Sequence, residues 1–202
     1  MRCRSQKAMT IMEILIGAAI MSIAAIGIYE LFFSGAKTAA LSMWRTKSNT
    51  ELRNTFQLLR NDMGRASYPS TITDMGTDIE KDVKCTIAGG RTEAGSDKTL
   101  VDFYMCKPEM AIAGTNKAGE RIHCVLALEG NKIRYTRDGP NPMNKVVISD
   151  VEYVDISSEA AADDAEKSVV TIEVGTIHPK FETTKVIDKT TAKVEVEVVG
   201  GS

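Results

Sequence analysis

The stretch from Lys7 to Phe33 reads KAMTIMEILIGAAIMSIAAIGIYELFF and decides the fold. It is apolar over most of its length, and no charged residue lies between Ile14 and Tyr29. Counted through Glu30 to its end, the apolar run has about 20 residues, the length that a helix needs to cross the hydrocarbon core of a bilayer. We therefore predict a transmembrane helix in this part of the chain.

Basic residues precede the apolar run. The first eight residues, MRCRSQKA, hold two arginines, one lysine and no acidic residue. Positive charge beside a membrane helix tends to stay in the cytoplasm. We therefore expect a single pass through the inner membrane, with the C-terminal domain in the periplasm.

A single carboxylate, that of Glu13, lies near the start of the run, where an acid costs free energy unless it has a function. A cleaved secretory signal would explain the basic head, and the sequence SGA at 34–36 offers a cleavage site. A plain signal anchor would explain the length. Neither interpretation gives the carboxylate a purpose. Both correspond to the alternative function, a signal-anchored periplasmic enzyme or solute-binding domain.

The residues A-MTIMEILIG resemble the type IV prepilin signal, in which a small residue is followed by a cleavage point, an apolar residue, Thr, two apolar residues and Glu. The resemblance implies that prepilin peptidase cleaves after Ala8, that the new amine on Met9 is methylated, and that Glu13 is the fifth residue of the mature chain. Two residues depart from the usual pattern, since the family has Gly where Ala8 stands and Phe where Met9 stands.

Electrostatics gives the carboxylate of Glu13 a purpose in such a protein. When subunits stack with an axial offset, this carboxylate can meet the Met9 amine of a neighbouring subunit. Opposite charges brought together in a low dielectric offset a desolvation cost that neither could bear alone. Such a pair also fixes the register of neighbouring helices. We therefore predict Ala8 and Met9 as the processing site, and Met9 and Glu13 as filament-assembly residues.

An amphipathic stripe continues beyond the apolar run. From Leu41 to Ala66 apolar residues recur every three or four positions, with Ser48 filling one gap, as on one face of a helix. Gly64 and Pro69 are expected to end this helix. The chain is thus divided into a leader (1–8), the transmembrane half of the helix (9–33), its amphipathic half (34–67) and an antiparallel β-rich periplasmic domain (68–202).

The period of the sequence changes to that of β-strands near residue 83. Runs rich in Val, Ile and Tyr occupy 83–88, 99–106, 121–129, 132–137, 145–156, 168–177 and 192–199. Gly130 and Asn131 predict a hairpin between two of them, whereas 157–167 is expected to be a short helical turn or a mobile loop. No helical pattern separates the strands, so a parallel sheet is not expected. The predicted fold class is α+β and pilin-like: one long N-terminal helix packed on an antiparallel sheet.

Three downstream segments extend the resemblance. They are LRNTFQLLRNDMGRASYPS (52–70), NKIRYTRDG (131–139) and NKVVISDVEYVDI (144–156), and they resemble segments of W-type minor pilins and of the J-type minor pseudopilin of type II secretion. The resemblance implies a structural subunit of a type IV pilus or of a type II secretion pseudopilus, with no enzymatic activity and no cofactor. Implied partners are other pilin or pseudopilin subunits, prepilin peptidase and an inner-membrane assembly platform. A DNA-uptake pseudopilus is a third option that the residues leave open.

Composition and cysteine spacing argue against two classes of protein, nucleic-acid binders and zinc proteins. The net charge of −2, the scattered basic residues and the 5% of aromatics argue against nucleic acid as a direct partner. Cys85, Cys106 and Cys124 lie downstream of the apolar run without any C-x-x-C pair, so a structural zinc site is not expected. In an exported domain one disulfide among these three is expected, and buried free thiols are the alternative.

Candidate catalytic residues are few. His123 stands next to Cys124, but adjacent residues of a strand point to opposite faces, so no Cys–His nucleophilic pair is expected. His178 precedes Pro179 at a predicted strand end, and Asp138 before Gly139 is typical of a turn.

Acidic residues gather in one downstream segment, where a calcium site is conceivable from the residue types alone. Glu159, Asp163 and Asp164 carry oxygens of the kind that calcium prefers, but they match no defined calcium loop and are expected to be solvated. The sequence therefore predicts no catalytic, cofactor or metal site.

Overall fold

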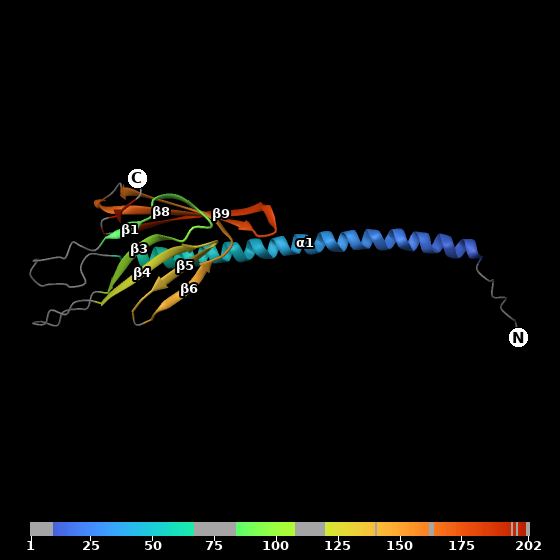
Figure 1. The fold of residues 1–202 in the computed structure, drawn as a ribbon, viewed down its shortest axis with the longest axis horizontal. Coiled ribbons are helices and arrows are strands. Elements are labelled where there is room, and N and C mark those ends of the chain that lie inside the picture. Colours follow the sequence, from blue (N-terminus) through green and yellow to red (C-terminus); the bar gives the residue numbers. More distant parts are fainter. Residues whose placement is uncertain are drawn as a thin grey trace, which may run out of the picture. The chain divides into compact units, whose positions relative to one another are not determined.

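A computed structural model of the chain describes residues 10–66, 84–107, 120–139, 141–161, 164–194, 196 and 198–200. The chain has two structural units, Met1–Met43 and Trp44–Ser202. Helix α1 (Ile11–Met63) begins in the first unit and ends in the second, and the described strands belong to the second unit (Figure 1). The helix contains a segment that is long and apolar enough to cross a membrane.

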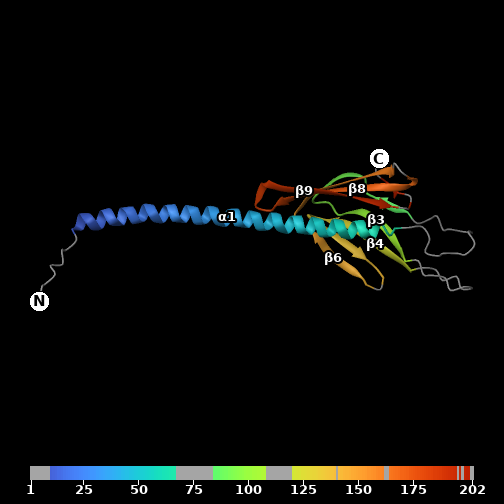
Figure 2. The same cartoon turned by 180° about the vertical axis from the view of Figure 1, so that it is seen from behind.

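Ten strands follow α1 in the described part of the chain. They are β1 (Cys85–Ile87), β2 (Gly90–Glu93), β3 (Lys98–Lys107), β4 (Glu120–Glu129), β5 (Lys132–Arg137), β6 (Met143–Ile148), β7 (Val151–Ala161), β8 (Asp164–His178), β9 (Phe181–Val194) and β10 (Val198–Val199). They form a six-stranded sheet of order β10-β1-β3-β4-β5-β6 and a four-stranded sheet of order β2-β7-β8-β9. In Figure 2, β8 and β9 lie on one side of the domain, and β4 and β6 lie on the other.

The predicted α+β class is confirmed, with corrections to the β part. Two sheets are present instead of one, and β1 pairs with β10 in parallel whereas the other neighbouring strands are antiparallel. The hairpin at Gly130 is confirmed, because Glu129 pairs with Lys132 and the glycine has a φ of 60°. The prediction of a helical turn or loop for 157–167 is wrong, since β7 continues through Ala161 and β8 begins at Asp164.

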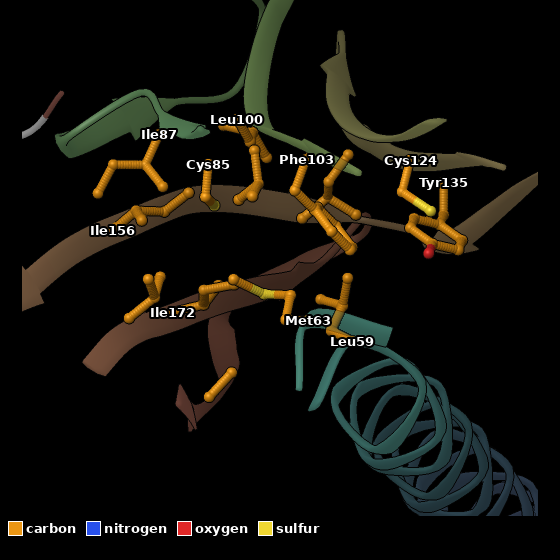
Figure 3. Packing of buried hydrophobic residues seen from close by; sticks show 14 of the residues in the cluster. Leu59, Met63, Cys85, Ile87, Leu100, Phe103, Cys124, Tyr135, Ile156 and Ile172 are labelled. Atoms are coloured by element: carbon orange, nitrogen blue, oxygen red, sulfur yellow. The ribbon is translucent and has the colours of Figure 1, made fainter. Parts of the chain in front are cut away.

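The second part of α1 buries one stripe of side chains, as its apolar spacing predicts. The buried residues are Ser48, Leu52, Thr55, Phe56, Leu59, Asp62 and Met63. Figure 3 shows Leu59 and Met63 in a core that also holds Phe103 of β3 and Ile172 of β8. The helix ends where Gly64 follows Met63, and the predicted stop at Pro69 lies outside the described residues.

Hydrogen bonds fasten α1 to both sheets. On the four-stranded sheet, the hydroxyl oxygens of Ser48 and Thr176 lie 2.7 Å apart. On the six-stranded sheet, the hydroxyl of Thr55 donates to the carbonyl oxygen of Val147 at 3.1 Å. Because β6 is an edge strand, this contact also occupies a backbone acceptor near an open sheet edge. The helix therefore joins the two sheets.

Between β6 and β7 the chain crosses from one sheet to the other at a corner formed by Ser149 and Asp150. Asp150 has a φ of 57°, a left-handed conformation that aspartate tolerates better than most residues. Its carboxylate accepts a hydrogen bond from Trp44 Nε1 at 3.0 Å. The carboxylate of Glu51 accepts from the backbone nitrogen of Ser149 at 3.1 Å and from its hydroxyl at 3.0 Å. Two side chains of α1 thus hold the corner that separates β6 from β7.

The pairing of β7 with β8 requires a glycine at one position. Tyr153 lies across Gly175, and a Cβ atom at this glycine would stand 2.3 Å from the Tyr153 ring. The guanidinium of Arg91 covers the ring at 3.7 Å from its centroid, and the phenolic hydroxyl donates to Glu173 at 2.8 Å. Any larger residue in place of the glycine would have to displace this packed ring.

Candidate assembly site on the N-terminal helix

The first turn of α1 carries a reciprocal pair of hydrogen bonds between Thr10 and Glu13. The backbone nitrogen of Thr10 donates to Glu13 Oε2 at 2.9 Å, and its hydroxyl donates to the same oxygen at 3.1 Å. In return, the backbone nitrogen of Glu13 donates to the Thr10 hydroxyl at 3.4 Å. This arrangement is a capping box, in which a threonine before the helix and a glutamate in its first turn satisfy each other's backbone donors.

The capping box gives Glu13 a local function that sequence reasoning missed. The signal was present, because T-x-x-E before an apolar run is typical of a helix start. In the described part of the chain only Oε2 accepts hydrogen bonds, so Oε1 is left for a donor from elsewhere. Ala8 and Met9 lie outside the described residues. Cleavage between them and a bond to the Met9 amine therefore stay predictions.

The side chains of the first unit form an exposed apolar surface. Ile11 is 80% exposed, and Leu31 and Phe32 are each 76% exposed. The rings of Tyr29 and Phe33 stack at 6.4 Å, one helical turn apart. A soluble monomer rarely exposes so large a contiguous apolar patch, so this surface is suited to lipid or to other apolar helices.

A polar cluster lies where the second part of α1 meets the six-stranded sheet. Asp62 is 4% exposed and accepts a hydrogen bond from the hydroxyl of the fully buried Tyr135 at 2.7 Å. A guanidinium nitrogen of Arg137 lies 3.5 Å from the same carboxylate oxygen. Burial, together with the hydrogen bonds to Cys124 and Asp62, raises the pKa of Tyr135 far above its usual range. The cluster therefore keeps a neutral phenol and a paired carboxylate inside the domain.

The thiols of Cys85 and Cys124 are free and buried. Each of the three pairs among Cys85, Cys106 and Cys124 includes one of them, so none of these disulfides is present in the structure. Burial raises the pKa of Cys85 to about 12 and that of Cys124 to about 11. Both behave as small core hydrophobes, which is the alternative that the sequence left open.

The raised thiol pKa values predict slow alkylation in the folded protein. At pH 8 iodoacetamide is expected to leave Cys85 and Cys124 unmodified for hours and to label both once guanidinium unfolds the domain, as read by peptide mass spectrometry. Because the folded state favours the protonated thiols, their contribution to the free energy of unfolding is complete below pH 9, the usual pKa of a thiol. The free energy of unfolding should fall as the pH rises from 9 towards 11 and 12. Rapid labelling of either residue in the folded chain would contradict this expectation.

His123 is a half-exposed residue on the face of the sheet opposite Cys124. Its Nε2 lies 2.7 Å from a carboxylate oxygen of Asp102, and its Nδ1 lies 3.8 Å from one of Asp138. The ring of Tyr104 stacks on the imidazole at 4.7 Å between centroids. Cys124 is fully buried whereas His123 is half-exposed, so the two side chains lie on opposite faces of the strand, as its alternation predicts.

His178 ends β8, as its position before Pro179 suggested. Its Nδ1 accepts backbone hydrogen bonds from Lys180 at 3.0 Å and Phe181 at 3.2 Å, which fixes the turn into β9. The imidazole therefore has a local structural function.

Two of the three acidic residues with oxygens of the kind that calcium prefers are on described strands: Glu159 pairs with Val169 and Asp164 pairs with Ala161, so the two are not opposite each other in the ladder. Glu159 is exposed on β7, Asp163 lies outside the described residues, and Asp164 begins β8. Among the residues that the structure describes, no group of three or more His, Cys, Asp or Glu side chains could hold a metal ion.

The architecture of the chain is pilin-like: a long N-terminal helix that is apolar in its first part and packs on a β domain with its second part. Its fold places the capping box and the exposed apolar surface on the same helix as the buried stripe. Comparisons with protein-family models, with curated proteins and with solved structures found no match to this chain.

Proposed function

We propose that the chain is a structural minor subunit of a type IV pilus or of a type II secretion pseudopilus, with no enzymatic activity. It is held in the inner membrane by the first part of α1, with its β domain in the periplasm, until it enters the filament. The difference in burial between the two parts of α1 supports this proposal. Residues from Ile11 to Phe33 are exposed and mostly apolar, whereas from Ser48 onward one stripe of α1 is buried in the domain.

Assembly would transfer the exposed half of α1 from lipid to a bundle of similar helices. Both environments are apolar, so the free energy of transfer depends on packing and on polar contacts. Gly17 and Gly27 present backbone without side chains, which allows neighbouring helices to approach closely. The open oxygen of Glu13 supplies an acceptor for a neighbour's amine. Partners in this process would be other subunits, prepilin peptidase and an inner-membrane assembly platform.

The mature N-terminus tests the proposal directly. In cells that contain prepilin peptidase, intact-mass and peptide mass spectrometry are expected to find a chain that begins with N-methylated Met9. An Ala8→Leu variant provides the control, because a bulky residue at the small position should leave the leader attached. A chain that starts at Lys37 would instead identify a secreted protein, and an unprocessed chain with normal Ala8 would identify a plain signal anchor.

A further inference from the structure

We propose, on the basis of the function proposed above, that a groove between α1 and β9 binds an extended acidic segment of another subunit, which lies along the free edge of β9. The groove has a volume of about 790 Å³. It is lined by Arg53, Gln57, Arg60 and Asn61 of α1 and by Asp188 and Lys189 of β9. Figure 1 labels both elements.

The first argument is charge. The lining contains two arginines and one lysine against a single aspartate. Arg53 makes no ion pair within the described residues, and Arg60 donates to the neutral hydroxyl of Thr190 at 3.3 Å. A guanidinium that faces a groove without a carboxylate partner is suited to a bidentate contact with an incoming one.

The second argument is spacing. Arg53 and Arg60 are two helical turns apart, about 10.5 Å at 1.5 Å per residue, and so lie on one face of α1. Alternate residues of an extended strand point to the same side and repeat at about 6.8 Å. Acidic residues two and four positions apart in a strand would therefore bracket the distance between the two arginines, within the reach of their flexible side chains.

The third argument is the open edge of β9. This 14-residue strand ends the order of its sheet, and no other described strand pairs with its outer side. Apart from the ladder with β8, residues 185–194 make no backbone–backbone hydrogen bond in the described part of the chain. Such an edge offers donors and acceptors in the pattern that only another peptide backbone matches.

Asp188 reduces the positive charge of the groove at this edge. Its carboxylate accepts a hydrogen bond from the backbone nitrogen of Lys189 at 2.9 Å and places a negative charge in the groove. It would repel a polyphosphate backbone and also weaken, without preventing, the approach of an acidic peptide. The combination of a peptide edge with two guanidinium groups that have no carboxylate partner among the described residues favours an acidic strand as the occupant over nucleic acid.

Binding of a defined peptide tests the inference on the full chain in detergent micelles. The probe is a fluorescein-labelled peptide TVEVTVEVT, and its control has glutamine in place of both glutamates. Fluorescence anisotropy in 50 mM salt is expected to show that the acidic peptide binds and the control does not, with affinity falling as salt rises. Arg53→Gln together with Arg60→Gln should weaken binding at least tenfold. Arg45→Gln, an exposed arginine of α1 outside the groove, should change it less than twofold.

A second test uses a variant that should bind the acidic peptide more tightly. Asp188→Asn keeps an oxygen acceptor for Lys189 but removes the negative charge, so it should tighten binding of the acidic peptide two- to fivefold. The inference is overturned if the wild-type chain does not bind the acidic peptide, if both peptides bind equally, or if Arg45→Gln weakens binding as much as the groove variants. Preferential binding of a dT12 oligonucleotide would overturn it in favour of nucleic acid. Filament assembly plays no part in this measurement, so its failure leaves the proposed function standing.

Discussion

Replacing Glu13 with alanine is expected to leave the protein in the membrane but to reduce its incorporation into filaments at least tenfold. Membrane insertion depends on the apolar run, and removal of an acid makes that run more apolar. Assembly would lose both the capping box with Thr10, worth about 1 kcal/mol for a helix start, and the acceptor for the Met9 amine of a neighbour. Carbonate extraction measures the first quantity, and immunoblotting of sheared filaments measures the second.

Two matched variants separate the contributions of Glu13. Glu13→Gln retains the capping box, because glutamine serves in the same position, but it removes the charge. Thr10→Val removes the hydroxyl of the cap and retains the charge. We expect the glutamine variant to assemble as poorly as alanine, and the valine variant to assemble several times better than either.

The opposite order would overturn the charge-pair hypothesis. If Glu13→Gln assembles normally and Thr10→Val does not, the helix cap alone explains why the acid is present. Normal incorporation of Glu13→Ala would remove the residue from the assembly mechanism altogether. The comparison requires equal amounts of the variants in the membrane. Carbonate extraction measures these amounts.

Replacing Asp62 with alanine is expected to lower the free energy of unfolding of the β domain by about 3–5 kcal/mol, the usual cost of breaking a buried ion pair. The change leaves the Tyr135 hydroxyl without its acceptor and Arg137 without its carboxylate. Trp44, which contacts His178 at 5.1 Å between ring centroids, belongs to the same unit and reports its unfolding by fluorescence. Urea titration of the full chain in micelles gives the difference.

A double-mutant cycle provides the control for Asp62. Tyr135→Phe alone should cost about 1–2 kcal/mol, since it removes one buried hydrogen bond and leaves the carboxylate its arginine partner. The variant with both substitutions should lose less free energy of unfolding than the sum of the two single losses. Once Tyr135 is phenylalanine, removing Asp62 no longer leaves a buried hydroxyl without an acceptor. Strict additivity would mean that the two residues do not act as a pair.

The helix, its apolar first part and its amphipathic second part were predictable from the sequence because all three depend on strong, local patterns. An unbroken apolar run and a stripe repeating every three or four residues have few other interpretations. Strands such as β5, whose predicted bounds of 132–137 match the structure, were found because their apolar and polar residues alternate. The burial of Cys124 opposite His123 follows from the same alternation.

Features that depend on contacts distant in sequence were not predictable. Most of β9 was missed because Thr184 and Thr190 occupy two of its buried positions, where apolar residues would be expected. The sequence predicts a single strand over 145–156, yet the strand breaks at Ser149 and Asp150, which are hydrogen-bonded to Glu51 and Trp44 of α1. The hairpin after residue 156 was missed because alanine and glutamate favour helix locally, and pairing with β8 overrides that preference.

The contacts that join α1 to both sheets also bear on mechanics. They follow one another along the helix: Trp44 with Asp150, Ser48 with Thr176, Glu51 with Ser149, Thr55 with Val147, and Asp62 with Tyr135. A tension applied along the axis of α1, such as an extending filament would exert, loads these bonds together in shear. Because they share the load, the β domain should resist extraction from its helix far better than one bond at one end would allow.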